Sequence, residues 1–159
     1  MPRIRIISGG QTGADRAALD AALAAGVECG GWCPEGRLAE DGPIASSYPL
    51  AELAGGGYRQ RTLRNIEDSD GTAIFYFGRP TGGTELTLAK CIRLHQPYKL
   101  IDAAEVDPRR ASGMLRGFVA EHRVLTLNIA GPRESASPGT YAFVLEAVAL
   151  FIDSFPGHR

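Results

Sequence analysis

The chain has 159 residues, 44% of them hydrophobic, and its 18 acidic and 17 basic side chains leave a formal net charge of -1 at pH 7. This length and composition fit one domain that buries roughly two-thirds of the surface exposed by the unfolded chain. The balanced charge argues against a nucleic-acid partner, and the lack of a signal peptide, of a membrane-length apolar run and of a disulfide framework predicts a cytoplasmic protein without a membrane partner.

Short β-branched or aromatic runs alternate with amphipathic stretches, a pattern typical of βαβ units. The first strand is predicted over residues 4–8, before an alanine-rich helix that ends at Gly26. A weak second strand surrounds residues 27–31. A glycine- and proline-rich segment over residues 32–60 has no predicted structure, and such long loops are usually functional or mobile.

In the second half of the chain, a strand over residues 72–77 has the continuous apolar character of a strand buried on both faces. A helix from residue 84 to about residue 94 and a strand over residues 98–101 follow. Asp107 and Pro108 predict the start of another helix, as N-cap and first helical residue.

A last strand over residues 124–129 precedes a final helix. Helical spacing predicts core-facing stripes on the two C-terminal helices, made by Ala111, Met114, Leu115, Phe118, Val119, Val144, Leu145, Val148, Phe151, Ile152 and Phe155. The sequence thus predicts a single α/β domain over residues 1–159 with a mostly parallel sheet.

Four loops rich in glycine or small polar residues are expected to converge. Right-handed crossovers bring all strand-to-helix loops of a parallel sheet to one edge, where ligands bind. These loops are residues 9–15, 32–37, 78–84 and 131–135. Backbone N–H groups of glycine turns at helix N-termini attract anions, so we expect a small phosphorylated ligand at this edge.

The first glycine turn follows a strand and opens a helix, as a phosphate-binding turn does; it consists of Gly9, Gly10, Gln11, Thr12 and Gly13. No Lys-Ser or Lys-Thr pair follows it, and it does not match G-x-G-x-x-G, which argues against an ATPase and an ordinary dinucleotide dehydrogenase. A tight turn that serves packing alone is the alternative. Asp15 is either a partner of the helix dipole or a hydrogen-bond acceptor for the ligand.

The same geometry recurs where Gly82, Gly83 and Thr84 open the next helix. Thr84 either caps that helix or donates its hydroxyl to a phosphate. Two glycine turns of this kind at one sheet edge arise by chance less often than one does, which favours phosphate binding. Glu85 is either a first-turn partner of the helix dipole or an acidic group for catalysis.

Three arginines and one tryptophan are further candidates. Arg37, Arg61 and Arg133 offer guanidinium donors to phosphate or carboxylate, with a surface position as the alternative. Trp32 stacks on a flat heterocycle or packs in the protein. The cysteines do not have the spacing of a zinc or redox site, so no protein-ligated metal is predicted.

The motifs together resemble the molybdenum-cofactor carrier family, and the similarity covers nearly the whole chain. They are residues 9–15, 31–37 and 40–42, Arg61-Thr62, Asn65, residues 68–72 and 82–84, Asn128 and residues 130–133. The resemblance implies a Rossmann-like, three-layer fold, a homo-oligomer, and binding of molybdenum cofactor, a pterin that carries a phosphate and molybdenum. The cofactor's own dithiolene holds the metal, so protein ligands are not required.

The family is related to the Lonely Guy phosphoribohydrolases, once misnamed lysine decarboxylases, whose motif Pro-Gly-Gly-x-Gly-Thr-x-x-Glu supplies a glutamate that acts with an upstream arginine. If Gly83-Thr84 matches Gly-Thr, Thr87 stands at the glutamate position and cannot act as a base, whereas Arg61 matches the arginine. We therefore expect a carrier without catalytic residues. A nucleoside-monophosphate hydrolase and a sensor of a nucleotide-derived ligand are the alternatives.

Overall fold

The computed structural model describes residues 3–155. Five parallel strands form the main sheet in the order β2-β1-β9-β7-β8. The central strand β9 pairs with both neighbours, so that Leu127 lies beside Ile6 of β1 and beside Gly71 of β7. The strands are β1 (Arg5–Ile7), β2 (Cys29–Gly30), β7 (Gly71–Tyr76), β8 (Tyr98–Asp102) and β9 (Thr126–Ala130).

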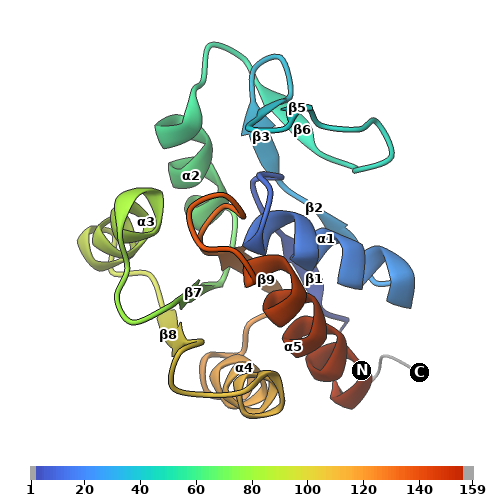
Figure 1. The fold of residues 1–159 in the computed structure, drawn as a ribbon, viewed down its shortest axis with the longest axis vertical. Coiled ribbons are helices and arrows are strands. Elements are labelled where there is room, and N and C mark those ends of the chain that lie inside the picture. Colours follow the sequence, from blue (N-terminus) through green and yellow to red (C-terminus); the bar gives the residue numbers. More distant parts are fainter. Residues whose placement is uncertain (1–2, 156–159) are drawn as a thin grey trace.

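Helices cover both faces of this sheet, which gives the α/β, Rossmann-like architecture of three layers (Figure 1). One face carries α1 (Ala14–Ala25), α4 (Pro108–His122) and α5 (Thr140–Ser154), and the other carries α2 (Tyr58–Glu67) and α3 (Gly82–Arg93). Successive residues of β7 alternate between the two cores: Ala73 and Phe75 pack with the first group of helices, and Ile74 packs with the second.

The chain direction creates a crevice at the carboxyl ends of the central strands. The connections β1–α1–β2 and β7–α3–β8 run toward opposite edges of the sheet, and their helices lie on opposite faces, as right-handed crossovers require. The loops that follow β1 and β7 therefore diverge, with β9 between them. Ligands of open α/β sheets bind at such a point.

Most predicted elements of the second half are confirmed. Asp107 caps α4 by accepting a hydrogen bond from the backbone N–H of Arg110 at 2.8 Å, and Pro108 is the first helical residue. Both apolar stripes are buried in, or packed against, the same core cluster. The described residues contain no helix that is both long and apolar enough to cross a bilayer.

The segment after residue 31 departs from the prediction. Residues 32–60 contain four short strands and the start of α2, where no structure was predicted. The parallel pair is β3 (Trp32–Pro34) with β6 (Ala51–Leu53), and the hairpin is β4 (Leu38–Ala39) with β5 (Gly42–Pro43). Strands of two or three residues are too short to show a hydrophobic period, which explains the wrong prediction.

Candidate binding site

A cavity of about 320 Å³ opens at the carboxyl ends of β1, β9 and β7. Its volume lies in the range of small-molecule sites. Four segments line it: the β1–α1 loop, the first two turns of α2, the start of α3, and the stretch from β9 into the loop before α5. Predicted site residues on its wall are Gly9, Gln11, Asp15, Arg61, Gly82, Gly83, Thr84 and Arg133.

Three of the four loops expected to converge line the cavity, whereas residues 32–37 do not, and the prediction was wrong for them. They lie behind α2, where the backbone of Trp32 hydrogen-bonds to the side chain of the lining residue Asn65. Among residues 3–155, the cavity wall does not include six of the predicted site residues, which are Gly10, Thr12, Gly13, Trp32, Arg37 and Glu85. Trp32 donates its indole N–H to Asp68 at 2.6 Å, and the guanidinium of Arg64 lies 4.3 Å from its ring centroid. Arg37 donates to the backbone carbonyls of Ile44, Ala45, Tyr48 and Leu50.

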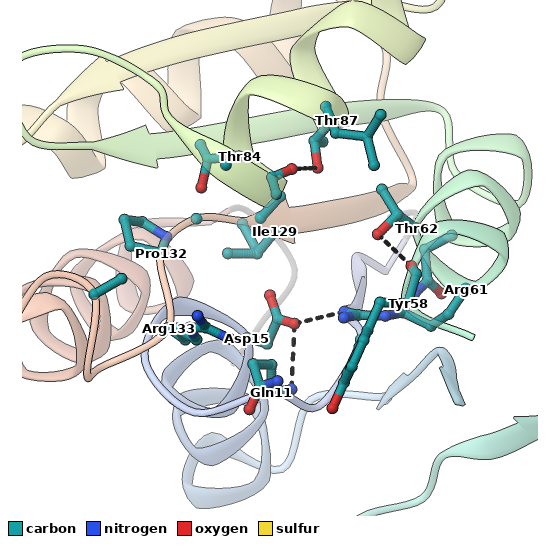
Figure 2. A pocket seen from close by; sticks show the side chains of 18 of the residues that line it. Gln11, Asp15, Tyr58, Arg61, Thr62, Thr84, Thr87, Ile129, Pro132 and Arg133 are labelled. Atoms are coloured by element: carbon teal, nitrogen blue, oxygen red, sulfur yellow. Dashed lines mark hydrogen bonds and ion pairs between the residues drawn. The ribbon is translucent and has the colours of Figure 1, made fainter. Parts of the chain in front are cut away.

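A buried ion pair forms one wall of the cavity (Figure 2). Nη1 of Arg61 donates to Oδ2 of Asp15 at 2.9 Å, and the two side chains are only 12% and 8% exposed. The backbone N–H of Gln11 donates to the same carboxylate oxygen at 3.2 Å. A Cβ atom at residue 9 would overlap Nη1 of Arg61, so Gly9 is required for the guanidinium to reach Asp15.

This pair keeps hydrogen-bonding capacity that the protein does not use. Burial raises the pKa of Asp15, although the neighbouring Arg61 opposes that rise. Within the described residues, Oδ1 of Asp15 has no hydrogen-bond donor, and the buried Nε of Arg61 has no acceptor. Because buried polar groups are normally paired, the unused capacity marks this wall as a place for a ligand or water.

The first glycine turn is packed against the protein, although only two of its five backbone N–H groups, those of Gln11 and Thr12, have an acceptor within residues 3–155. The backbone N–H of Thr12 donates to the Gln11 side chain at 3.0 Å, and the N–H of Ala14 donates to the carbonyl of Pro132 at 3.2 Å. A Cβ atom at Gly13, where φ is 78°, would overlap that same carbonyl. The turn therefore packs closely against the loop after β9, as the packing alternative predicts.

The second glycine turn is open by contrast. The N–H groups of Gly82 and Gly83 have no acceptor within residues 3–155, and Thr81 does not cap α3 with its side chain. A Cβ atom at Gly83 would meet nothing within 4 Å. Thr84 is buried beside it, whereas Glu85 is exposed. Free N–H groups at the start of a helix of this length attract anions.

The family model that matches residues 6–152 describes the circularly permutated YpsA SLOG family, cpYpsA. The chain belongs to this family. A crystal structure from Syntrophus aciditrophicus, of a protein named putative molybdenum carrier protein, is similar to the chain, with 40% sequence identity and a TM-score of 0.91. The match covers 94% of this chain and 96% of the other. The curated proteins compared with the chain gave no significant match.

In this cpYpsA chain, the tip of the β4–β5 hairpin holds two cavity loops together. Glu40 accepts hydrogen bonds from the hydroxyls of Thr12 and Ser135, both at 2.5 Å, and its carboxylate lies 3.5 Å from Nε of Arg133. The hydrogen bonds from Ser135 and Thr12 lower the pKa of Glu40. Arg133 is thus partly neutralised, which weakens it as an anion-binding group.

Sequence reasoning identified Arg61 but missed the helix α2 that carries it, and it named Thr62 and Asn65 only among the motifs of the resemblance. Tyr58, Arg59, Thr62 and Asn65 line the cavity together with Arg61. Their spacing of three, four and seven residues from Tyr58 places most of them on one helix face, and this period could have revealed the helix. Three further polar residues outside the predicted site set line the cavity, namely Thr81, Thr87 and Asn128 of β9, and Asn128 was named only among the motifs of the resemblance. Across residues 3–155, no three His, Cys, Asp or Glu side chains cluster as metal ligands.

Proposed function

We propose that the cavity binds a small phosphorylated ligand, and that the chain is a cytoplasmic carrier of molybdenum cofactor or a related phosphorylated pterin. One observation carries this proposal: the open N–H groups of Gly82 and Gly83 face the same cavity as the Arg61–Asp15 pair. The name of the similar structure, putative molybdenum carrier protein, supports the finer assignment.

The chemistry of the wall fits that ligand. The cofactor's phosphate needs hydrogen-bond donors, and the start of α3 supplies them. Its pterin is flat and carries both donors and acceptors, which the polar groups of Asp15 and Arg61 complement. When bound, the cofactor keeps molybdenum on its own dithiolene, so the protein has to bind and shield the ligand without supplying metal ligands.

The test uses molybdenum cofactor released anaerobically from a molybdoenzyme and titrated into the protein by calorimetry. The variant Gly83→Leu places a side chain in open cavity space without a clash. Gly117→Leu is the matched control, because Gly117 is exposed on α4 and its added side chain also meets nothing within 4 Å. We expect saturable binding that Gly83→Leu weakens at least tenfold and Gly117→Leu leaves unchanged. Absence of saturable binding, or equal binding by both variants, contradicts the proposal.

A second candidate function is hydrolysis of the N-glycosidic bond of a nucleoside monophosphate. The observation that favours it is the buried carboxyl of Asp15, with a raised pKa and an arginine partner, on a cavity wall. Glu85 does not line the cavity, and Thr87 donates its hydroxyl to the carbonyl of Gly83 at 3.0 Å. Release of free base from nucleoside monophosphates, lost in Asp15→Asn, would establish it; no release from any of them excludes it.

We also propose that the chain forms a homo-oligomer. Several large apolar side chains are exposed on the described surface, among them Leu23, Ile92, Tyr98 and Leu125, which are 44%, 53%, 39% and 46% exposed. Ile92 and Tyr98 line the same shallow surface hollow, and exposed apolar residues that lie together mark association sites. Light scattering coupled to gel filtration gives the molar mass, and a monomer at micromolar concentration contradicts this proposal.

A further inference from the structure

We infer that the ligand binds in one orientation, with its phosphate at the start of α3 and its ring edge against Asp15, and that Asp15 selects rings carrying an N–H donor. This inference rests on the proposed binding of a phosphorylated heterocycle and adds which wall holds which end. Figure 2 shows Thr84 and Thr87 on one side of the cavity, and Asp15, Gln11 and Tyr58 on the other.

Asp15 offers the ligand a single, fixed acceptor atom. Its Oδ2 is occupied by Nη1 of Arg61 at 2.9 Å and by the N–H of Gln11 at 3.2 Å. Its Oδ1 has no donor among residues 3–155 and points into the cavity, although the side chain is only 8% exposed. This oxygen is not among the buried unpaired atoms, so it remains accessible from the cavity, where a ligand N–H could donate to it.

Arg61 adds donors beside that acceptor. Its guanidinium has five N–H groups, of which one bonds to Asp15. Nε is buried and unpaired, whereas the N–H groups on Nη2 have no acceptor within residues 3–155 and are not among the buried unpaired atoms. A donor and an acceptor side by side complement a ring amide edge, in which a carbonyl oxygen and an N–H are neighbours. Pterins have such an edge. Tyr58, whose ring centroid lies 5.6 Å from the same guanidinium, adds an aromatic face on this side of the cavity.

Charge directs the phosphate to the opposite side. The charges of Asp15 and Arg61 cancel, and the free carboxylate oxygen would repel a phosphate placed next to it. The start of α3 has free N–H groups at Gly82 and Gly83, and no carboxylate of α3 lines the cavity, because Glu85 lies outside it. The positive end of the α3 dipole therefore receives the phosphate.

The substitution Asp15→Asn makes the ring assignment testable. The N–H groups of Gln11 and Arg61 both donate to Oδ2, so the amide oxygen of the variant has to occupy that place. Its NH₂ group then takes the place of Oδ1, and the atom facing the ligand changes from acceptor to donor. The variant should lose its preference for rings with an N–H and favour rings that present acceptors only.

The probes are pterin and 1,3-dimethyllumazine, two flat pteridines of which only pterin has N–H groups. Each is titrated into the protein, and binding is measured by fluorescence. We expect the unmodified protein to bind pterin at least tenfold more tightly than 1,3-dimethyllumazine, and Asp15→Asn to abolish or invert that ratio. Asp20→Asn is the matched control, because Asp20 lies on the same helix and bonds to Tyr48 and Tyr141 outside the cavity. An unchanged ratio in Asp15→Asn overturns the ring assignment.

The phosphate end is tested separately with pterin and 6-hydroxymethylpterin phosphate. We expect the phosphate to strengthen binding at least tenfold in the unmodified protein and in Asp15→Asn, but not in Gly83→Leu. If the phosphate strengthens binding equally in all three proteins, the proposed orientation is wrong. The comparison of the unmodified protein with Gly83→Leu remains valid even if Asp15→Asn does not fold. If molybdenum cofactor binds but the ratios do not change, the orientation alone is wrong. If neither the cofactor nor any pteridine binds, the proposed function fails with it.

Discussion

Replacing Arg61 by alanine should produce a pH-dependent loss of stability. The change leaves Asp15 buried without its cation, which typically costs about 3–5 kcal/mol. Protonation limits that cost: neutralising a carboxyl of ordinary pKa 3.8 at pH 7 takes about 4 kcal/mol, at about 1.4 kcal/mol per pH unit. We therefore expect Arg61→Ala to lower the free energy of unfolding by about 3–4 kcal/mol at pH 7.

The sign of the pH dependence follows from the same group. Burial already raises the pKa of Asp15 in the folded protein, so its contribution to stability is greatest below pH 3.8 and falls as the pH rises through the folded-state value. Without Arg61 the pKa of buried Asp15 rises further, so stability is lost over a wider range of pH above 3.8. At pH 4, where the buried carboxyl is protonated in both proteins, the stability lost through Arg61→Ala should be below about 1 kcal/mol.

Urea denaturation followed by circular dichroism at pH 4 and pH 7 measures this effect. The double variant Arg61→Ala with Asp15→Asn should recover most of the loss at pH 7, because the amide needs no counter-ion. Arg64→Ala is the control on the same helix: its ion pair with Asp68 is 44% and 42% exposed, and its guanidinium stacks on Trp32, so its loss should cost about 2 kcal/mol or less. An equal penalty at both pH values, or no recovery in the double variant, would refute the reasoning.

Three further outcomes are expected. Gly13→Ala forces a Cβ atom into the carbonyl of the β9–α5 loop at positive φ, so it should lower the midpoint of urea denaturation and weaken ligand binding. Glu40→Gln weakens the link between hairpin and loops, and trypsin should then cut after Arg133 faster. Asp20→Asn removes the negative charge and one of the two oxygens that accept from the half-buried hydroxyls of Tyr48 and Tyr141. Their pKa values, raised to about 12 by burial and by Asp20, should therefore fall in a spectrophotometric titration.

The parallel sheet and the edge that carries the cavity could be predicted because they follow from long apolar periods and from crossover handedness, whereas the order of the strands was not predicted. The turn at Gly82 and Gly83 was identified because a glycine pair between a strand and a helix has few structural explanations. The partner of Asp15 was not predicted, since Arg61 lies 46 residues away and no local pattern links the two.

The wrong expectation for residues 32–37 has a physical reason. Sequence reasoning placed that loop at the carboxyl edge because it follows the second strand. Gly31, at φ 127°, instead leads into the parallel pair β3–β6, and the guanidinium of Arg37 binds four backbone carbonyls. The sequence alone does not distinguish an arginine that binds backbone carbonyls of its own loop from one that binds a phosphate.

The strand at the middle of the sheet is also the last strand of the chain. Until β9 is made, β1 and β7 lack their shared neighbour, and the nascent polypeptide cannot close its main sheet. The cavity wall runs from Gly9 to Ala136, so it is complete only after β9 and the loop that follows it have joined the sheet. A fragment that ends before β9 would therefore lack one side of the cavity as well as the middle of the sheet.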